Sequence, residues 1–250
     1  MNRTIAALLV LVTLALPVST ALASGADVGE GYAKPTYPEL IQTLILMGGS
    51  DITNTKIADE YGRLVYCDLY EKDFSNDVLW EKIRDEIVAR ALQKKEYYRV
   101  KYEVTSIFYL DRYDFKNEYF PISKKTPIAN VGTVNMLAPD DYRSDCTGQG
   151  VYSNLFPMTV VLQLNEPLTI QGFKLPKERV DKLIVRMEEA GDMDRRVYGR
   201  MRMVVTDAKG IDFSQSNTAE VALNGKVISV DFFIDRELTK PIASILVNKE

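Results

Sequence analysis

The chain contains 250 residues, and its 31 basic and 35 acidic side chains give a formal net charge of −4, so no general electrostatic attraction to nucleic acid is expected. The absence of histidine excludes Ser-His-Asp and Cys-His catalysis and every histidine-ligated metal centre. No glycine-rich phosphate-binding motif occurs, so the sequence predicts neither a nucleotide nor any other cofactor.

Residues 1–23 are typical of a secretory signal. Arg3 supplies a positive start, an apolar run follows, and Ala21-Leu22-Ala23 forms a small-x-small cleavage site. A membrane anchor is the alternative, but the apolar run is interrupted and falls short of the ~20 residues that a spanning helix needs. We therefore expect an exported, periplasmic protein cleaved after Ala23, with residues 24–36 as a flexible lead and no membrane span after cleavage.

Three helices are predicted after this lead. The first covers residues 37–47 and is followed by two glycines, which suit a helix end. The second begins near Asn54 or Thr55 and carries Ile57, Tyr61, Leu64 and Val65 along one side, with Asp68 as a further candidate for that side. The third combines a candidate N-cap with an apolar stripe at the spacing of a core-facing helix: Ser75 or Asn76, then Leu79, Trp80, Ile83, Ile87 and Ala91.

Aromatic residues are dense between Glu96 and Phe120, where apolar and polar side chains alternate. The alternation predicts a strand whose buried face holds the even-numbered residues Tyr98, Val100, Tyr102, Val104, Phe108 and Leu110. A second set of aromatic and basic residues follows the odd positions: Tyr97, Arg99, Tyr109 and Tyr113. Two interpretations of this set stay open, because it can cover a second structural layer or form a recognition surface of aromatic rings beside cations.

The second half of the chain predicts strands and one helix. Residues 158–164 and 195–205 alternate as strands do, and an amphipathic helix lies between Pro176 and Gly191. The pair Asn224-Gly225 predicts a hairpin turn. The predicted helices cluster in the first part of the chain, and strands dominate the later part. This order favours an α+β fold, with N-terminal helices followed by an antiparallel sheet and one further amphipathic helix.

Two short segments occur twice. The sequence FYLDR at Phe108–Arg112 resembles FFIDR at Phe232–Arg236, and TPIANV at Thr126–Val131 resembles KPIASI at Lys240–Ile245. A duplication would give two helix-plus-sheet units, one in residues 37–140 and one in residues 141–250. A single compact domain is the alternative.

The chain has two cysteines, Cys67 and Cys146. In an oxidising compartment an even number of cysteines favours one disulfide, although two free thiols are the alternative that the sequence leaves open.

Charged clusters supply the remaining candidates for chemistry. Arg195, Arg196, Arg200 and Arg202 can form an anion-binding stripe or the exposed face of a strand, and we retain Arg200 and Arg202 as candidate ligand-binding residues. Acidic clusters at 111–114, 140–145 and 188–194 can serve a carboxylate-dependent glycosidase, but solvated turns also produce such clusters. We assign no catalytic residue and no metal site.

The motifs YDF (Tyr113–Phe115) with YFPI (Tyr119–Ile122), and LP (Leu175-Pro176) with RRVY (Arg195–Tyr198), resemble those of an uncharacterised family of exported bacterial proteins. The resemblance covers Tyr113–Val205. It implies a domain of unknown function in an exported protein and transfers no catalytic residue.

The expected function is therefore that of a non-enzymatic protein of the bacterial envelope. Its expected partner is an envelope protein, a peptide or a cell-wall component. A carboxylate-dependent glycan hydrolase is the alternative function, because that chemistry needs only two suitably placed acids.

Overall fold

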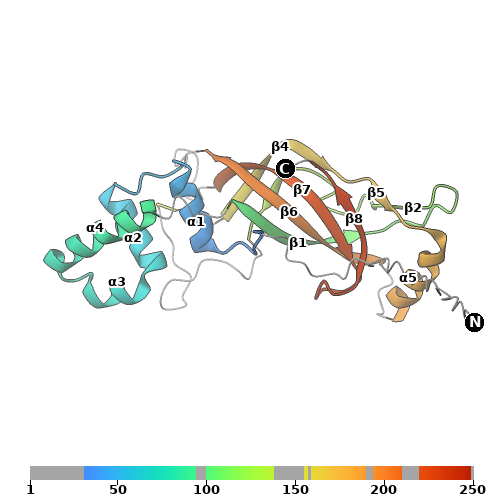
Figure 1. Cartoon of the computed structure of the whole chain (residues 1–250), viewed down its shortest axis with the longest axis horizontal. Helices are drawn as coiled ribbons and strands as arrows, with labels where there is room; N and C mark the ends of the chain where they lie inside the picture. Colours follow the sequence, from blue (N-terminus) through green and yellow to red (C-terminus); the bar gives the residue numbers. More distant parts are fainter. Residues whose placement is uncertain are drawn as a thin grey trace, which may run out of the picture.

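The computed structural model describes residues 31–93, 100–137, 155–156, 159–189, 194–209 and 220–248. The helices in this part of the chain are α1 (Tyr37–Leu46), α2 (Thr55–Val65), α3 (Cys67–Asp73), α4 (Asp77–Gln93) and α5 (Lys177–Glu189) (Figure 1). The strands are β1 (Lys101–Tyr109), β2 (Tyr119–Pro121), β3 (Asn130–Asn135), β4 (Thr159–Thr169), β5 (Gly172–Lys174), β6 (Arg196–Ala208), β7 (Glu220–Phe233) and β8 (Pro241–Leu246). The fold is α+β, as predicted.

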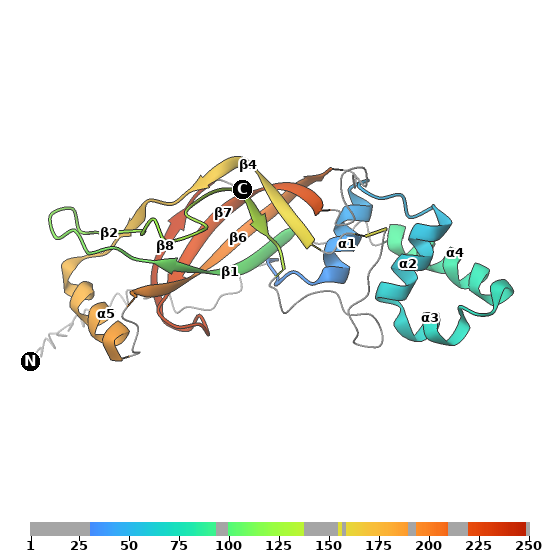
Figure 2. The same cartoon turned by 180° about the vertical axis from the view of Figure 1, so that it is seen from behind.

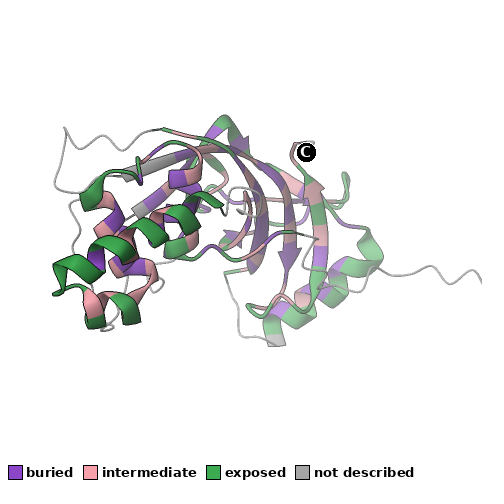
Figure 3. Cartoon of the chain, turned by 60° about the vertical axis from the view of Figure 1, so that its left-hand side comes forward, coloured by how far each residue is buried: buried purple, intermediate pink, exposed green. Residues whose placement is uncertain are grey.

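The molecule is elongated, with a curved sheet between two helical ends. Helices α2, α3 and α4 form one end of the long axis, and α5 lies at the opposite end (Figures 1 and 2). Helix α1 lies between the other N-terminal helices and the sheet. Buried residues follow the sheet, whereas much of the outer surface of the helices is exposed (Figure 3).

Asparagine side chains fix the starts of two helices. The Asn54 Oδ1 accepts a hydrogen bond from the backbone N–H of Lys56 at 3.0 Å, and the Asn76 Oδ1 accepts one from Leu79 at 3.1 Å. The helix predicted from Asn54 or Thr55 is present as α2, but it ends at Val65 and does not include the candidate Asp68, because the chain leaves helical geometry at Tyr66, with φ −124° and ψ 51°. The break produces α3 as a separate helix.

The carboxylate of Asp59 joins α2 to α4. It accepts hydrogen bonds from Trp80 Nε1 at 2.7 Å and from Arg84 Nε at 2.6 Å. Gly62 lets these helices approach closely, since a Cβ there would lie 3.1 Å from the Ile87 side chain. Arg63 lies four residues after Asp59 on α2, a spacing at which ion pairs commonly form. Asp59 instead faces α4 and pairs with Arg84.

Buried hydrogen bonds join α1 to both neighbouring parts of the molecule. Gln42 Nε2 donates to the carbonyl of Ala91 in α4 at 2.9 Å, and its Oε1 accepts from the buried Tyr61 hydroxyl. The hydroxyl groups of Thr43 and Tyr102 are hydrogen-bonded at 2.8 Å. Because buried polar groups are costly without partners, these bonds fix the position of the helices against the sheet.

The main sheet has the strand order β1-β6-β7-β4-β3, with β8 also paired to β7. Strand β4 runs parallel to β7, so the expectation of an antiparallel sheet is corrected to a mixed one. The chain between β4 and β7 contains β5, α5 and β6, which is long enough for the crossover that a parallel pair requires. Strand β2 pairs with β5 in a separate two-stranded ribbon.

The predicted hairpin at Asn224-Gly225 is wrong, because both residues lie inside β7. A Cβ at position 225 would lie 2.3 Å from the Val204 carbonyl oxygen and 2.8 Å from Leu162 Cδ1. The glycine permits close approach of the neighbouring strands and makes no turn.

Both halves of the chain contribute to one sheet and one core. The similar segments begin at Phe108 and Phe232, near the ends of strands β1 and β7, and these two strands lie on either side of β6. The centroids of the Phe108 and Phe232 rings are 5.1 Å apart, and the Phe173 centroid lies 4.8 Å from that of Phe232. The segments 37–140 and 141–250 therefore share a continuous core.

Replacement of Gly199 tests this packing. A Cβ at position 199 would lie 2.3 Å from Phe108 Cε2, so Gly199→Ala should lower the free energy of unfolding by about 1–3 kcal/mol. Chemical denaturation measures the change. Gly132→Ala is the matched control, because no atom lies within 4 Å of the new Cβ, and its effect should be near zero. Equal stability of the two variants would contradict the proposed packing.

Cys67 takes part in a disulfide. Its predicted partner, Cys146, lies outside the described residues, so the pairing stays a prediction. A loop of roughly 80 residues closed by this bond should contribute about 4 kcal/mol in the chain-entropy model. Thermal melting of the purified protein with and without reductant checks this, and two titratable thiols in the native protein would refute it.

Candidate functional site

Of the even-numbered residues predicted to be buried, Tyr102, Phe108 and Leu110 are 0%, 0% and 5% exposed. Val100 and Val104 are only half-buried, and Tyr98 lies outside the described residues. The residues at the odd positions do not share one degree of burial in the described structure. Tyr109 is half-buried, and Tyr97 and Arg99 lie outside the described residues. The four residues of the odd set therefore give no defined recognition surface in the described structure.

Tyr113, which the sequence left as either covered or exposed, is buried and only 7% exposed. Its hydroxyl donates a hydrogen bond to the carbonyl of Leu175 at 2.6 Å. Its ring packs against Phe115 and Phe120, with centroids 4.9 and 4.8 Å away. Tyr113 thus supports the chain just before α5 and presents no ring for stacking against a ligand.

Arg200 and Arg202 lie on the face of the sheet opposite to the one that carries Tyr102. Acidic residues of the adjacent strands lie on the same face as the two arginines. Asp231 Oδ2 lies 3.2 Å from Arg200 Nη2 and 3.5 Å from Arg202 Nη1. Glu103 Oε2 lies 3.9 Å from Arg200 Nε and 4.0 Å from Arg202 Nε. Two cations face two carboxylates, so this cluster has no excess positive charge for an anionic ligand.

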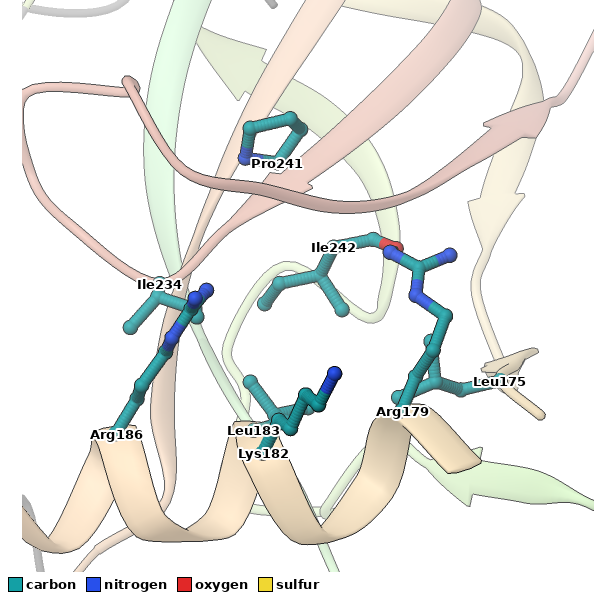
Figure 4. A pocket seen from close by; sticks show the side chains of 8 residues that line it. All are labelled: Leu175, Arg179, Lys182, Leu183, Arg186, Ile234, Pro241 and Ile242. Atoms are coloured by element: carbon teal, nitrogen blue, oxygen red, sulfur yellow. The ribbon is translucent and has the colours of Figure 1, made fainter. Parts of the chain in front are cut away.

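A groove between α5 and β8 provides a different arrangement (Figure 4). Its apolar lining consists of Leu175, Leu183, Ile234, Pro241 and Ile242, and its basic lining consists of Arg179, Lys182 and Arg186. The volume is about 100 Å³. Pockets for small-molecule ligands typically measure ~300–1,000 Å³, so this groove is sized for a side chain rather than for a cofactor.

The helical repeat of α5 places the three basic residues in one row. Arg179, Lys182 and Arg186 are three and four residues apart, the spacing that puts side chains on one side of a helix. The adjacent side of the helix carries Val180, Leu183 and Met187, which are buried against the core. The same amphipathic pattern that attaches α5 to the sheet thus turns its cations toward β8.

The three cations differ in their partners. Arg179 Nη2 donates to the carbonyl of Ile242 at 3.0 Å, which ties α5 to β8. Lys182 and Arg186 are exposed, and among the described residues neither has a hydrogen-bond or ion-pair partner. Figure 4 shows both side chains directed over the groove. An anionic group next to an apolar side chain is the ligand chemistry that this surface complements.

The acidic cluster that includes Asp114 has a structural role. Asp114 accepts hydrogen bonds from Asn117 Nδ2 at 2.6 Å and from the backbone N–H groups of Asn117 and Lys116 at 3.1 and 2.9 Å. The Asn117 side chain holds the pKa of Asp114 below its usual value. Residues 140, 141, 145 and 192 lie outside the described structure. Within the described residues, no group of three or more acids and cysteines is placed to hold a metal ion.

The fold and the groove define an α+β protein with a curled mixed sheet. Helices form one end of its long axis, and the basic groove lies at the other end. None of the described helices has both the length and the apolar character needed to cross a membrane. The chain belongs to the family of the domain of unknown function DUF4852, whose model matches residues 54–184. The match extends from α2 into α5 and so includes both helical ends and part of the sheet. No curated protein and no solved structure matches the chain.

The turn beside the groove gives a pH-dependent prediction. Partial burial raises the pKa of Asp235, but hydrogen bonds from Thr239 and Lys240 outweigh this effect and hold it below its usual value. The stabilisation from this carboxylate is therefore complete above about pH 4 and is lost as the pH falls through the lowered pKa of the folded state.

Asp235→Asn should lower the melting temperature at pH 7 and lessen the loss of stability between about pH 4 and pH 2. Thermal melts of the variant and the parent protein across this range measure the difference. Parallel curves at all pH values would show that Asp235 does not stabilise the turn through its charge.

Proposed function

We propose that this chain is a non-enzymatic protein of the bacterial envelope that binds an acidic, partly apolar segment of another protein in the groove between α5 and β8. The observation that carries the proposal is the pair of cations, Lys182 and Arg186, which have no partner among the described residues and lie beside an apolar floor. Export to the periplasm is part of the proposal and is supported by the signal-like pattern of residues 1–23.

The size of the groove favours a protein segment over a free small molecule. A volume of about 100 Å³ admits one apolar side chain, whereas the adjacent cations remain at the surface and meet carboxylates outside the groove. A partner would therefore insert an anchor residue and place acidic residues around it. Such an arrangement gives specificity through the pocket and a fast, salt-sensitive association through the charges.

In-cell photo-crosslinking tests the proposal. A photo-reactive amino acid at Pro241, an exposed residue of the groove lining, should give a discrete covalent adduct in envelope extracts. The reversal K182E/R186E should abolish this adduct, because it replaces two attractive charges with two repulsive ones. Immunoblotting of the adduct and fractionation of the tagged protein provide the measurements.

The same photo-reactive residue at Lys124, which is exposed between β2 and β3, is the control position and should give no such adduct. An adduct that survives charge reversal in the groove would contradict the proposed site. Digestion of purified cell-wall glycan by the parent protein, lost on changing one acidic residue, would contradict the non-enzymatic function and support glycan hydrolysis instead.

A further inference from the structure

The helical end of the molecule carries a second exposed surface, which we call the apolar tip. It consists of Leu69, Phe74, Val78 and Leu79, from α3, the turn after it and the start of α4. Val78 is 70% exposed and the other three are 38–40% exposed. These four exposed apolar side chains fall within eleven residues of chain, and exposed apolar patches mark interaction sites.

Aromatic rings pack together at this end of the molecule. Tyr70 stacks on Phe74 at 4.2 Å, and Trp80 meets Phe74 edge-on at 5.3 Å. Phe74 is thus held by two neighbouring rings, and it loses little side-chain freedom when a partner binds.

Acidic residues surround the apolar tip. Five carboxylates and two amines lie between residues 68 and 82: Asp68, Glu71, Asp73, Asp77 and Glu81, with Lys72 and Lys82. No hydrogen bond or ion pair of the Asp77 or Glu81 carboxylate occurs within the described structure, and both residues are exposed. Val78 is adjacent to Asp77 and one helical turn from Glu81, so a protruding apolar side chain is flanked by two free negative charges.

This arrangement is complementary to the groove at the other end of the molecule. The groove offers an apolar recess for one side chain, with Lys182 and Arg186 exposed beside it. We infer that the apolar tip of one molecule docks in the α5–β8 groove of a second copy, with Val78 in the recess and Asp77 and Glu81 against the two cations. This inference rests on the proposed function of the groove and names its partner as another copy of the chain.

The positions of the two surfaces determine the kind of assembly. The apolar tip and the groove lie at opposite ends of the long axis (Figures 1 and 2), so one molecule cannot join its own two surfaces. A head-to-tail contact leaves a free tip at one end and a free groove at the other. The products are open chains that lengthen with concentration, or closed rings where the rotation between copies permits. The small groove and exposed charges give weak contacts that salt weakens further.

Sedimentation velocity of the purified mature protein tests the inference. The weight-average sedimentation coefficient should rise between about 10 μM and 1 mM protein at low salt and fall again at about 0.5 M salt, where the Debye length is only a few ångströms. The variants V78D and K182E/R186E should each remain monomeric throughout. A one-to-one mixture should form a dimer and nothing larger, because only the V78D groove and the K182E/R186E tip are intact.

The control K124E/K125E makes the same change in net charge at two exposed lysines of the segment between β2 and β3, and should associate as the parent protein does. Unchanged circular dichroism and thermal melting of each variant exclude misfolding as the cause of lost association. A parent protein that stays monomeric at 1 mM, or a mixture that forms no dimer, overturns the inference.

The groove crosslink separates the two proposals. A Pro241 adduct with a different envelope protein, together with a monomeric purified protein, overturns self-association and leaves the binding function in place. Absence of both the adduct and the association overturns both. An adduct with the mass of two chains, lost in V78D as well as in K182E/R186E, supports head-to-tail assembly in the cell.

Discussion

The ring of Phe108 occupies the space beside Gly199 that a side chain would fill, and the union of both halves of the chain in one sheet depends on this contact. Strands β1 and β7 are separated by β6, and neighbouring strands lie about 4.8 Å apart. Rings on the outer two strands can meet only where the middle strand presents no side chain. Phe108 and Phe232 meet in this way, and Phe173 and Phe120 extend the aromatic contacts to the β2–β5 ribbon that precedes α5. The position of α5, and with it the groove, follows from this packing.

Local patterns in the sequence predicted those parts of the fold that local physics determines. Alternation predicted the burial of Tyr102 and Phe108 in β1, and the side chain of Asn54 marks the start of α2. The hairpin predicted from Asn224-Gly225 does not form, because a glycine permits a turn and a close strand contact equally well. Only the neighbouring Leu162 and Val204 decide between the two, and they are distant in the sequence. The break at Tyr66 has no local signal in the sequence, since neither glycine nor proline stands there.

The candidate site required information that the sequence does not contain. Arg200 and Arg202 were recognised as basic, but their neutralisation by Glu103 and Asp231 depends on the register of three strands. The groove cations recur at helical spacing in the sequence, but the amphipathic pattern of that segment predicts only which side of the helix is buried. Ile234 and Ile242, which complete the groove, are more than forty residues away in the chain, so no local motif joins them to α5.

Strand β7 pairs along one edge first with β4, in parallel, and then with β8, in antiparallel. Along its other edge it pairs with β6. This position has a consequence for the order of folding. Until residues 220–233 are available, β4 and β6 each lack a neighbour, and the half-built sheet exposes unsatisfied backbone groups that can pair with other chains. Pairings between such distant segments also form slowly. A chaperone that protects this chain would therefore act on β4 and β6 during the interval before β7 joins them.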